Sequence, residues 1–240
     1  MDEPCQPAFV KSEALTLISF GLTNEASKIN RQHAVAVLKE NLEIRSRLAS
    51  FGVTRDELLA VVAAAVGARR SASALAPASA GGLMAWIRGT EELRAVFLPK
   101  DGWEMTRTDN IEAVYHAGTG IKIIYQSADR AGDPIADPVA VSKKGLGSAR
   151  AVENGQGDLF PEYAAEALRE LNAASWYLFV HADGDDVRAE LSFPMAIEDD
   201  QFHGFNERIL LIQKGEWDIM DLAPDESPAP ELEILVRRKK

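Results

Sequence analysis

The chain has 240 residues, of which 46% are hydrophobic, and its formal net charge is −11 at pH 7. This length and composition suit one large folded domain or two small ones, and they exclude a wholly disordered chain. The single cysteine, Cys5, excludes an intramolecular disulfide and a cysteine-based zinc site, as is typical of proteins from a reducing cytoplasm.

The negative charge is concentrated in the C-terminal third of the sequence. Residues 161–240 contain eight Lys/Arg against eighteen Asp/Glu, whereas residues 1–75 contain nine against eight. An acidic surface repels phosphate backbones, so we expect no direct nucleic-acid binding by the C-terminal third. The first residues lack the basic and apolar regions of a signal peptide, and no apolar run reaches the roughly 18 residues that span a bilayer. We therefore expect a cytoplasmic protein with no membrane partner.

The first 67 residues are predicted to be helical. A long helix is expected to begin after Thr23 or Asn24 and to end at Gly52, with helically spaced apolar residues at Val35, Leu38, Leu42 and Leu48. The sequence Thr54-Arg55-Asp56-Glu57 is a capping box that opens a further helix over residues 58–66, with Gly67 as its stop. We therefore predict a helical N-terminal unit over residues 1–75.

The helix over residues 58–66 is apolar nearly all round, so it must be covered by something. It could be buried in the fold or form a homo-oligomer contact through residues 1–67. A helix-turn-helix at residues 48–54 is disfavoured, because this helix presents almost no side chain that could hydrogen-bond to base edges.

A linker is predicted at residues 76–82, followed by an α+β domain over residues 83–240. The small residues of this stretch are typical of linkers. Beyond it, a helix is expected at 83–95, and alternating apolar residues predict a mainly antiparallel sheet. Its expected strands are a meander at 103–107, 111–116 and 121–126, a hairpin at 176–181 and 187–193 around Gly184, and single strands at 208–213 and 231–236. A second helix is expected at about 162–171.

Residues 127–161 show no sustained period and are predicted to form a long loop, a setting that is commonly functional. Within it, the pentapeptide Gln156-Gly157-Asp158-Leu159-Phe160 resembles the bacterial sliding-clamp-binding peptide. The pattern of that peptide is Gln, an aliphatic residue, Ser or Asp, Leu, Phe, and Gly157 departs from it. The resemblance implies that Gln156, Asp158, Leu159 and Phe160 are partner-binding residues. The alternative is that Leu159 and Phe160 dock the following helix onto the protein's own core.

Residues 100–210 also resemble a set of uncharacterised bacterial proteins that are associated with mobile genetic elements. The residues that carry this resemblance are Gly102-Trp103, Thr108-Asp109-Asn110, Lys143-Lys144-Gly145, the clamp-like peptide, Trp176, Glu190-Leu191-Ser192 and Pro194. The resemblance implies a bacterial origin, which the clamp hypothesis requires. It implies no activity.

Two patterns of acidic and histidine residues invite a metal hypothesis. His181, Asp183, Asp185 and Glu190 lie within ten positions, and Glu198-Asp199-Asp200 precedes His203. Both patterns are better explained as turns, because Asp and Gly favour turns for backbone reasons. We therefore predict no metal site and no cofactor.

A nuclease of the PD-(D/E)xK type needs acidic residues and a lysine around a divalent ion. Asp109 and Glu112 precede Lys122, but no Asp/Glu-x-Lys lies on that strand. The sequence thus favours a non-enzymatic accessory or adaptor protein that binds the clamp in replication, repair or mobile-DNA biology. The alternatives are a partner-regulating protein of a defence or toxin–antitoxin system, and a metal-dependent nuclease without a familiar motif.

Overall fold

The computed structural model describes residues 35–154 and 170–218. The chain divides into two compact units, Met1–His33 and Ala34–Lys240, and every described residue belongs to the second. The described α-helices are α1 (Asn41–Ala49), α2 (Arg55–Arg70), α3 (Ala80–Phe97) and α4 (Leu146–Asn154). The described strands are β1 (Ala36–Leu38), β2 (Trp103–Thr106), β3 (Ala113–His116), β4 (Ile121–Asp129), β5 (Val139–Ala140), β6 (Ala174–Asp183), β7 (Asp186–Glu198) and β8 (Gln201–Ile212), and a 3-10 turn, η1, covers Thr108–Asn110.

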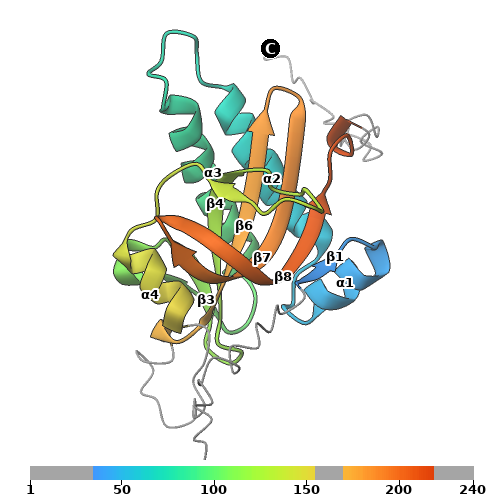
Figure 1. The fold of residues 1–240 in the computed structure, drawn as a ribbon, viewed down its shortest axis with the longest axis vertical. Helices are drawn as coiled ribbons and strands as arrows, with labels where there is room; N and C mark the ends of the chain where they lie inside the picture. Colours follow the sequence, from blue (N-terminus) through green and yellow to red (C-terminus); the bar gives the residue numbers. More distant parts are fainter. Residues whose placement is uncertain (1–34, 155–169, 219–240) are drawn as a thin grey trace, which may run out of the picture. The chain divides into compact units, whose positions relative to one another are not determined.

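These strands form one mainly antiparallel sheet in the order β1-β8-β7-β6-β4-β3-β2, with β5 paired to β4 (Figure 1). Among the described strands, two neighbouring pairs are parallel, β1 with β8 and β4 with β6, and the others are antiparallel. The predicted α+β class with a mainly antiparallel sheet is confirmed. The predicted meander and the hairpin around Gly184 are confirmed too, the hairpin turning where Gly184 takes a φ of +56°.

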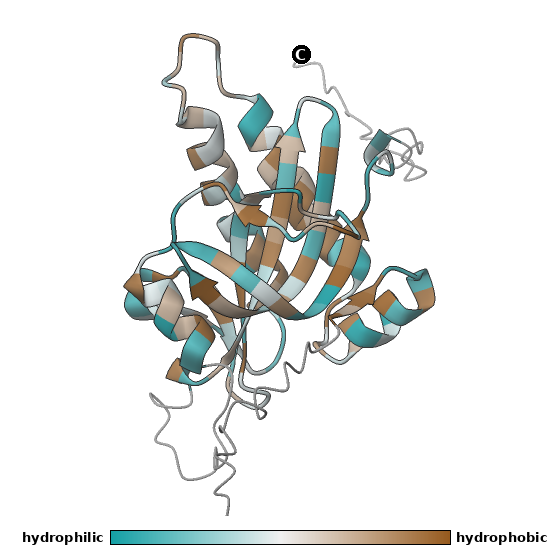
Figure 2. Cartoon of the chain, in the orientation of Figure 1, coloured by the Kyte–Doolittle hydropathy of each residue, from teal (hydrophilic) through white to brown (hydrophobic). Residues whose placement is uncertain are grey.

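One face of the sheet carries the larger hydrophobic core. The helices α2 and α3 pack side by side on this face, which is the rear one in Figure 1. Strand β6 shows why both faces are covered: Trp176, Leu178 and Val180 point into the helical core, while Tyr177 and Phe179 belong to the core of the opposite face. Figure 2 shows hydrophobic residues along the central strands and hydrophilic residues at the tip of the β6–β7 hairpin.

The opposite face is covered by α4 and by the outer half of the β7–β8 hairpin. The pairing of β7 with β8 shifts register between Phe193 and Pro194, and such a bulge bends a hairpin. The bent part brings Phe202 and Phe205 onto Phe179, with ring centroids 5.0 and 6.0 Å away. Val152 of α4 is fully buried in the same cluster.

The capping box at the start of α2 forms as the sequence predicts. The Thr54 hydroxyl accepts a hydrogen bond from the Glu57 amide at 3.2 Å, and the Thr54 amide donates to the Glu57 carboxylate at 2.8 Å. The predicted stop at Gly67 is wrong, because the helix continues for three residues to Arg70. The apolar side of α2 is covered by α3 and the sheet, with Leu58 and Val62 fully buried. The argument for self-association that rested on this helix is thereby removed.

The structure corrects the predicted helix that was to run through residues 35–48. Residues Ala36–Leu38 form β1, which pairs with β8, and the helix begins only at Asn41. The edge of β8 offers backbone hydrogen bonds to residues 36–38, and these bonds decide the local structure over a weak helical pattern. Leu42, which the helical pattern placed in the core, is 81% exposed. The beginning of the predicted helix lies outside the described residues.

The predicted boundary at residues 76–82 is not where the chain divides. Residues 71–79 connect two helices of the same unit, since Leu93 and Phe97 of α3 share a core with Val61 and Val62 of α2. Small residues therefore mark a helix–helix connection here. The N-terminal helical unit of residues 1–75 and the α+β domain of residues 83–240 are not separate in the described part.

The predicted long loop over residues 127–161 contains regular structure. Residues 127–129 end β4, Val139–Ala140 form β5, and Leu146–Asn154 form α4. The sequence analysis missed α4 because Gly147 and Ser148 near its start are residues typical of loops. The helix packs through small residues: a Cβ added at Gly147 would lie 2.6 Å from the Asp109 carbonyl oxygen. The strand expected at 231–236 and most of the helix expected at 162–171 lie outside the described residues.

Candidate functional site

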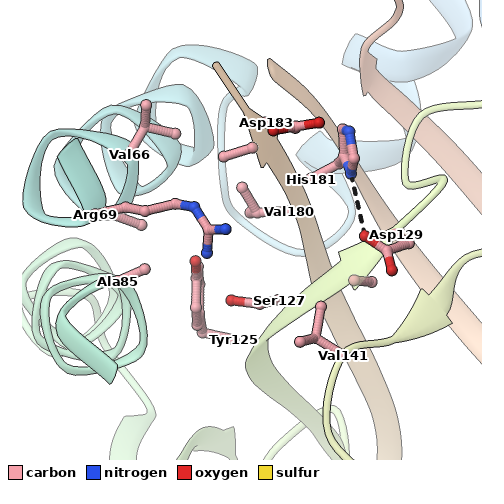
Figure 3. Close-up of a pocket in the computed structure, with 13 residues that line it drawn as sticks. Val66, Arg69, Ala85, Tyr125, Ser127, Asp129, Val141, Val180, His181 and Asp183 are labelled. Carbon is pink, nitrogen blue, oxygen red and sulfur yellow. Dashed lines mark ion pairs between the residues drawn. The ribbon is translucent and has the colours of Figure 1, made fainter. Parts of the chain in front are cut away.

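A cleft of about 930 Å³ lies between the α2–α3 connection, strand β4 and residues 141–148. Its position follows from the lengths of the strands. Strand β3 pairs with β4 over residues 121–124, and β5 pairs with it from Ala128, next to a hydrogen bond from the Val141 amide to the Ser127 carbonyl at 3.2 Å. The edge of β4 at Tyr125 and Gln126, between these contacts, is left open to the cleft. A smaller hollow of about 140 Å³ adjoins it and shares Arg69, Tyr125 and Ser127 with it (Figure 3).

Two buried tyrosines line this cleft. The Tyr125 ring packs against α3 at Gly89, where an added Cβ would lie 2.6 Å from the ring. Burial raises the pKa of the Tyr125 hydroxyl. A hydrogen bond with Ser127 and the positive charge of Arg69 lower this pKa, but their effect is smaller than that of burial. Tyr177 is 2% exposed, and its hydroxyl has no hydrogen-bond partner among the described residues. Burial raises the pKa of Tyr177 as well.

Lys144 supplies one positive charge to the cleft. Its ammonium group contacts the Gln126 side-chain oxygen, lies 3.5 Å from the Ser142 hydroxyl, and lies 5.5 Å from the centre of the Phe202 ring. Burial lowers the pKa of Lys144 from 10.5 to about 8. The backbone fixes this position, because the Lys144 amide donates to the carbonyl of Asp200 at 2.9 Å.

Arg69 supplies a second positive charge. It lies in the last turn of α2, and Figure 3 shows its guanidinium directed toward the Tyr125 hydroxyl. Within the described ranges, its side chain makes no ion pair or hydrogen bond with a carboxylate. Glu112 lines the same cleft, but its carboxylate contacts Arg94 and lies 3.2 Å from Arg107. Partial burial opposes ionisation of Glu112, yet the hydrogen bonds and charges of these arginines hold its pKa below the usual value.

The grouping of His181, Asp183, Asp185 and Glu190, which the sequence analysis weighed as a metal site and set aside, does not assemble. His181 lies between two other carboxylates, with Nδ1 at 3.6 Å from Asp129 (Figure 3) and Nε2 at 3.8 Å from Asp186. The Asp185 side chain is 96% exposed at the hairpin tip. The Glu190 carboxylate is buried against Arg208. No group of three or more His, Cys, Asp or Glu suited to a metal ion occurs in the described part of the chain.

The second acidic pattern is a turn. Asp199 and Asp200 connect β7 to β8 with positive φ angles of 49° and 61°. His203 and Glu198 are largely exposed, and His203 Nδ1 lies 4.0 Å from Glu198 Oε2.

The three residues weighed for a nuclease do not form one cluster, because Glu112 is held by two arginines, whereas Asp109 interacts electrostatically with Lys122. Asp109 lies 3.3 Å from Arg150, and Glu112 is bound by Arg94 and Arg107. Lys122 is 3% exposed on the other end of β4, and burial lowers its pKa against the opposing charges of Glu170 and Asp109.

The clamp-like residues Gln156, Asp158, Leu159 and Phe160 lie outside the described residues, in the connection between α4 and β6. The sequence interpretation did not single out the cleft. In the sequence analysis Lys144 is part of a predicted loop and of the resemblance over residues 100–210, and Gly81 and Gly82 are part of a predicted linker. The signal available in the sequence was the pair Gly81-Gly82 shortly after Ser79 at the start of a helix, because such a helix start can bind an anion.

Searches of protein-family models, of curated proteins and of solved structures each return no match for this chain. No helix among the described residues combines the length and the apolar character that crossing a membrane requires.

Proposed function

We propose that this chain is a non-enzymatic accessory protein of the bacterial cytoplasm that binds the DNA sliding clamp through residues 156–160. The observation that carries the proposal is the sequence Gln156-Gly157-Asp158-Leu159-Phe160. The resemblance of residues 100–210 to bacterial proteins of mobile elements is consistent with a role in replication, repair or mobile-DNA biology.

The described elements on either side support this proposal, because both are anchored to the sheet. The Ser175 hydroxyl at the start of β6 donates to the Ala151 carbonyl of α4 at 3.0 Å. Arg150 of α4 lies 3.3 Å from Asp109. Strand β4 pairs directly with β6, so the peptide belongs to the crossover that joins these two neighbours. A peptide held at both ends loses less conformational entropy on binding than a free one.

The chemistry of the peptide supports binding by two apolar anchors. Leu159 and Phe160 would enter an apolar cleft on the clamp, while Gln156 would hydrogen-bond polar groups at its rim. Buried aromatic and aliphatic anchors dominate the affinity of such contacts. Gly157 gives no side-chain contact at the position where the clamp peptide carries an aliphatic residue.

The proposal is tested by restoring that missing contact. Full-length Gly157→Leu should bind a purified bacterial clamp about tenfold more tightly than the wild type, because one leucine side chain is added to the interface. Gly155→Leu is the matched control, since it adds the same side chain two residues earlier and outside the pattern. Titration calorimetry measures both. Equal affinities for the two variants would contradict the proposed docking.

A further inference from the structure

The N-terminus of α3 offers unpaired hydrogen-bond donors to the cleft. The N-cap residue Ser79 makes no side-chain capping bond. The Ala80 amide donates to the Pro77 carbonyl at 2.8 Å, but the amides of Gly81 and Gly82 have no acceptor among the described residues. Both glycines line the cleft. The positive end of the 18-residue helix α3 therefore faces the cleft. Because Gly81 and Gly82 have no side chains, a ligand can approach their backbone closely.

The two cations of the cleft complement this helix end. The Arg69 guanidinium nitrogen Nη1 lies 4.0 Å from the point where a Cβ on Gly82 would stand. Lys144 lines the same cleft from the loop before α4, and its neighbours Gln126, Ser142 and Phe202 are uncharged. Neither cation is neutralised by a carboxylate within residues 35–154 and 170–218. In a chain of net charge −11, such a concentration of positive charge favours an anion.

A buried hydroxyl provides an independent indication of a ligand. Tyr177 lines the cleft, is 2% exposed, and its hydroxyl is unpaired among the described residues. A buried polar group without a partner is costly, and native proteins usually satisfy it. The hydroxyl itself is inaccessible to solvent, so a ligand in the cleft would become its partner only after the residues around it shift.

The cleft also has an aromatic wall. Trp86 follows Gly82 by one turn of α3 and lines the cleft with 42% of its surface exposed. Leu83 lies beside it and is 55% exposed. A flat indole next to an anion site suits a ligand that carries a ring on one end and a phosphate on the other, since bases stack on aromatic side chains. The cleft volume of about 930 Å³ lies in the range of small-molecule pockets.

We propose that this cleft binds a nucleotide, with the phosphate at the α3 N-terminus between Arg69 and Lys144 and the base against Trp86. The Gly81 and Gly82 amides donate to the phosphate oxygens. The same chemistry is presented by a free nucleotide and by the terminal nucleotide of a nucleic-acid strand. This site is independent of the clamp peptide.

The test is calorimetric titration of the full-length chain with ATP, with a 5′-phosphorylated oligothymidine, and with inorganic phosphate. Binding of ATP alone identifies a free nucleotide, whereas tighter binding of the oligonucleotide identifies a strand end. Inorganic phosphate should bind more weakly than either, because it has no ring for Trp86. Binding should weaken above about pH 8, where Lys144 loses its proton.

Each binding residue has a neighbouring control. Arg69→Ala, Lys144→Met and Trp86→Ala should each weaken binding about tenfold or more. Arg70→Ala, Lys143→Met and Ile87→Ala should not, because none of these three residues lines the cleft. Thermal melting of every variant separates a binding defect from a folding defect.

Three results would overturn the proposal. One is the absence of binding by ATP and by the oligonucleotide at millimolar concentration. Another is unchanged affinity in folded Arg69→Ala and Lys144→Met. Phosphate binding as tight as ATP binding, with Trp86→Ala unaffected, would exclude a nucleotide and leave only an adventitious anion.

Discussion

Arg208 and Glu190 form a buried two-point ion pair between β8 and β7, with Nε–Oε1 at 2.9 Å and Nη2–Oε2 at 2.6 Å. The Glu190 carboxylate also accepts hydrogen bonds from the Ser192 hydroxyl at 2.7 Å and from the Gly132 amide at 2.8 Å. Arg208 donates in turn to the Asp133 carbonyl at 2.8 Å. The pair thus holds the turn after β4 onto the sheet.

Breaking this pair should be strongly destabilising. Glu190→Ala leaves the Arg208 charge buried without its partner, so we expect a loss of about 3–5 kcal/mol in the free energy of unfolding. Replacing both residues by apolar ones, Glu190→Leu with Arg208→Met, should cost less. Urea denaturation measures both, with Asp185→Asn at the exposed hairpin tip as the control. A stable Glu190→Ala variant would show that the pair is not structural.

Two glycines should respond in opposite directions to alanine. Gly89→Ala places a Cβ 2.6 Å from the Tyr125 ring, so α3 and β4 must separate and stability should fall by about 1–3 kcal/mol. Gly67→Ala in α2 meets no atom within 4 Å and should raise stability by up to about 1 kcal/mol. Denaturant midpoints report both effects. Equal effects of the two substitutions would contradict the close contact between α3 and β4.

Lys144 should make stability rise with pH. Its folded-state pKa of about 8 lies below its ordinary value of 10.5. Between these values the unfolded chain holds a proton that the folded chain has lost, so the free energy of unfolding increases with pH. Below pH 8 both states are protonated and this contribution is flat.

The measurement is the difference between wild type and Lys144→Met in unfolding free energy from pH 7 to pH 10. This difference should shift in favour of the wild type as pH rises, whereas Lys143→Met should show no such trend. A difference independent of pH would place the Lys144 ammonium in solvent.

Divalent metal should leave stability unchanged. Two of the residues that the sequence groups with His181 are held elsewhere by the fold, since Asp185 is exposed and Glu190 is bound to Arg208. We therefore expect no increase in melting temperature with millimolar Mg²⁺ or Mn²⁺. A concentration-dependent increase would reveal a metal site by mass action.

The sequence predicted those elements whose apolar pattern is strong. Apolar and polar residues alternate clearly in the meander and in the β6–β7 hairpin. The capping box of Thr54 and Glu57 marks the start of α2. The prediction failed for β1 and α4, which depend on tertiary contacts: β1 forms because β8 offers a free edge, and α4 packs through small residues such as Gly147. Local patterns carry no information about such partners.

The cleft could not be predicted in the same way. Its residues come from α2, the α2–α3 connection, α3, residues 110–112, β4, residues 141–148 and β6, and only the fold brings them together. Arg69, Lys144 and Tyr177 are ordinary residues in the sequence. Among the described residues, Arg69 and Lys144 have no carboxylate partner and the Tyr177 hydroxyl has no hydrogen-bond partner. These features are visible only in three dimensions. A linear motif such as residues 156–160 is the opposite case, because it can be recognised from consecutive residues in the sequence alone.

The most direct test of the proposed function is calorimetric titration of the full-length Leu159→Ala/Phe160→Ala variant with a purified bacterial sliding clamp. The wild type should bind with a dissociation constant of about micromolar, because a short peptide must become ordered on binding. The double variant should lose binding and keep its melting temperature, while Leu146→Ala, an exposed leucine of α4, should change neither. Undiminished binding by the double variant would contradict the account, and so would a loss of several kcal/mol of stability, which would place the two side chains in the protein's own core.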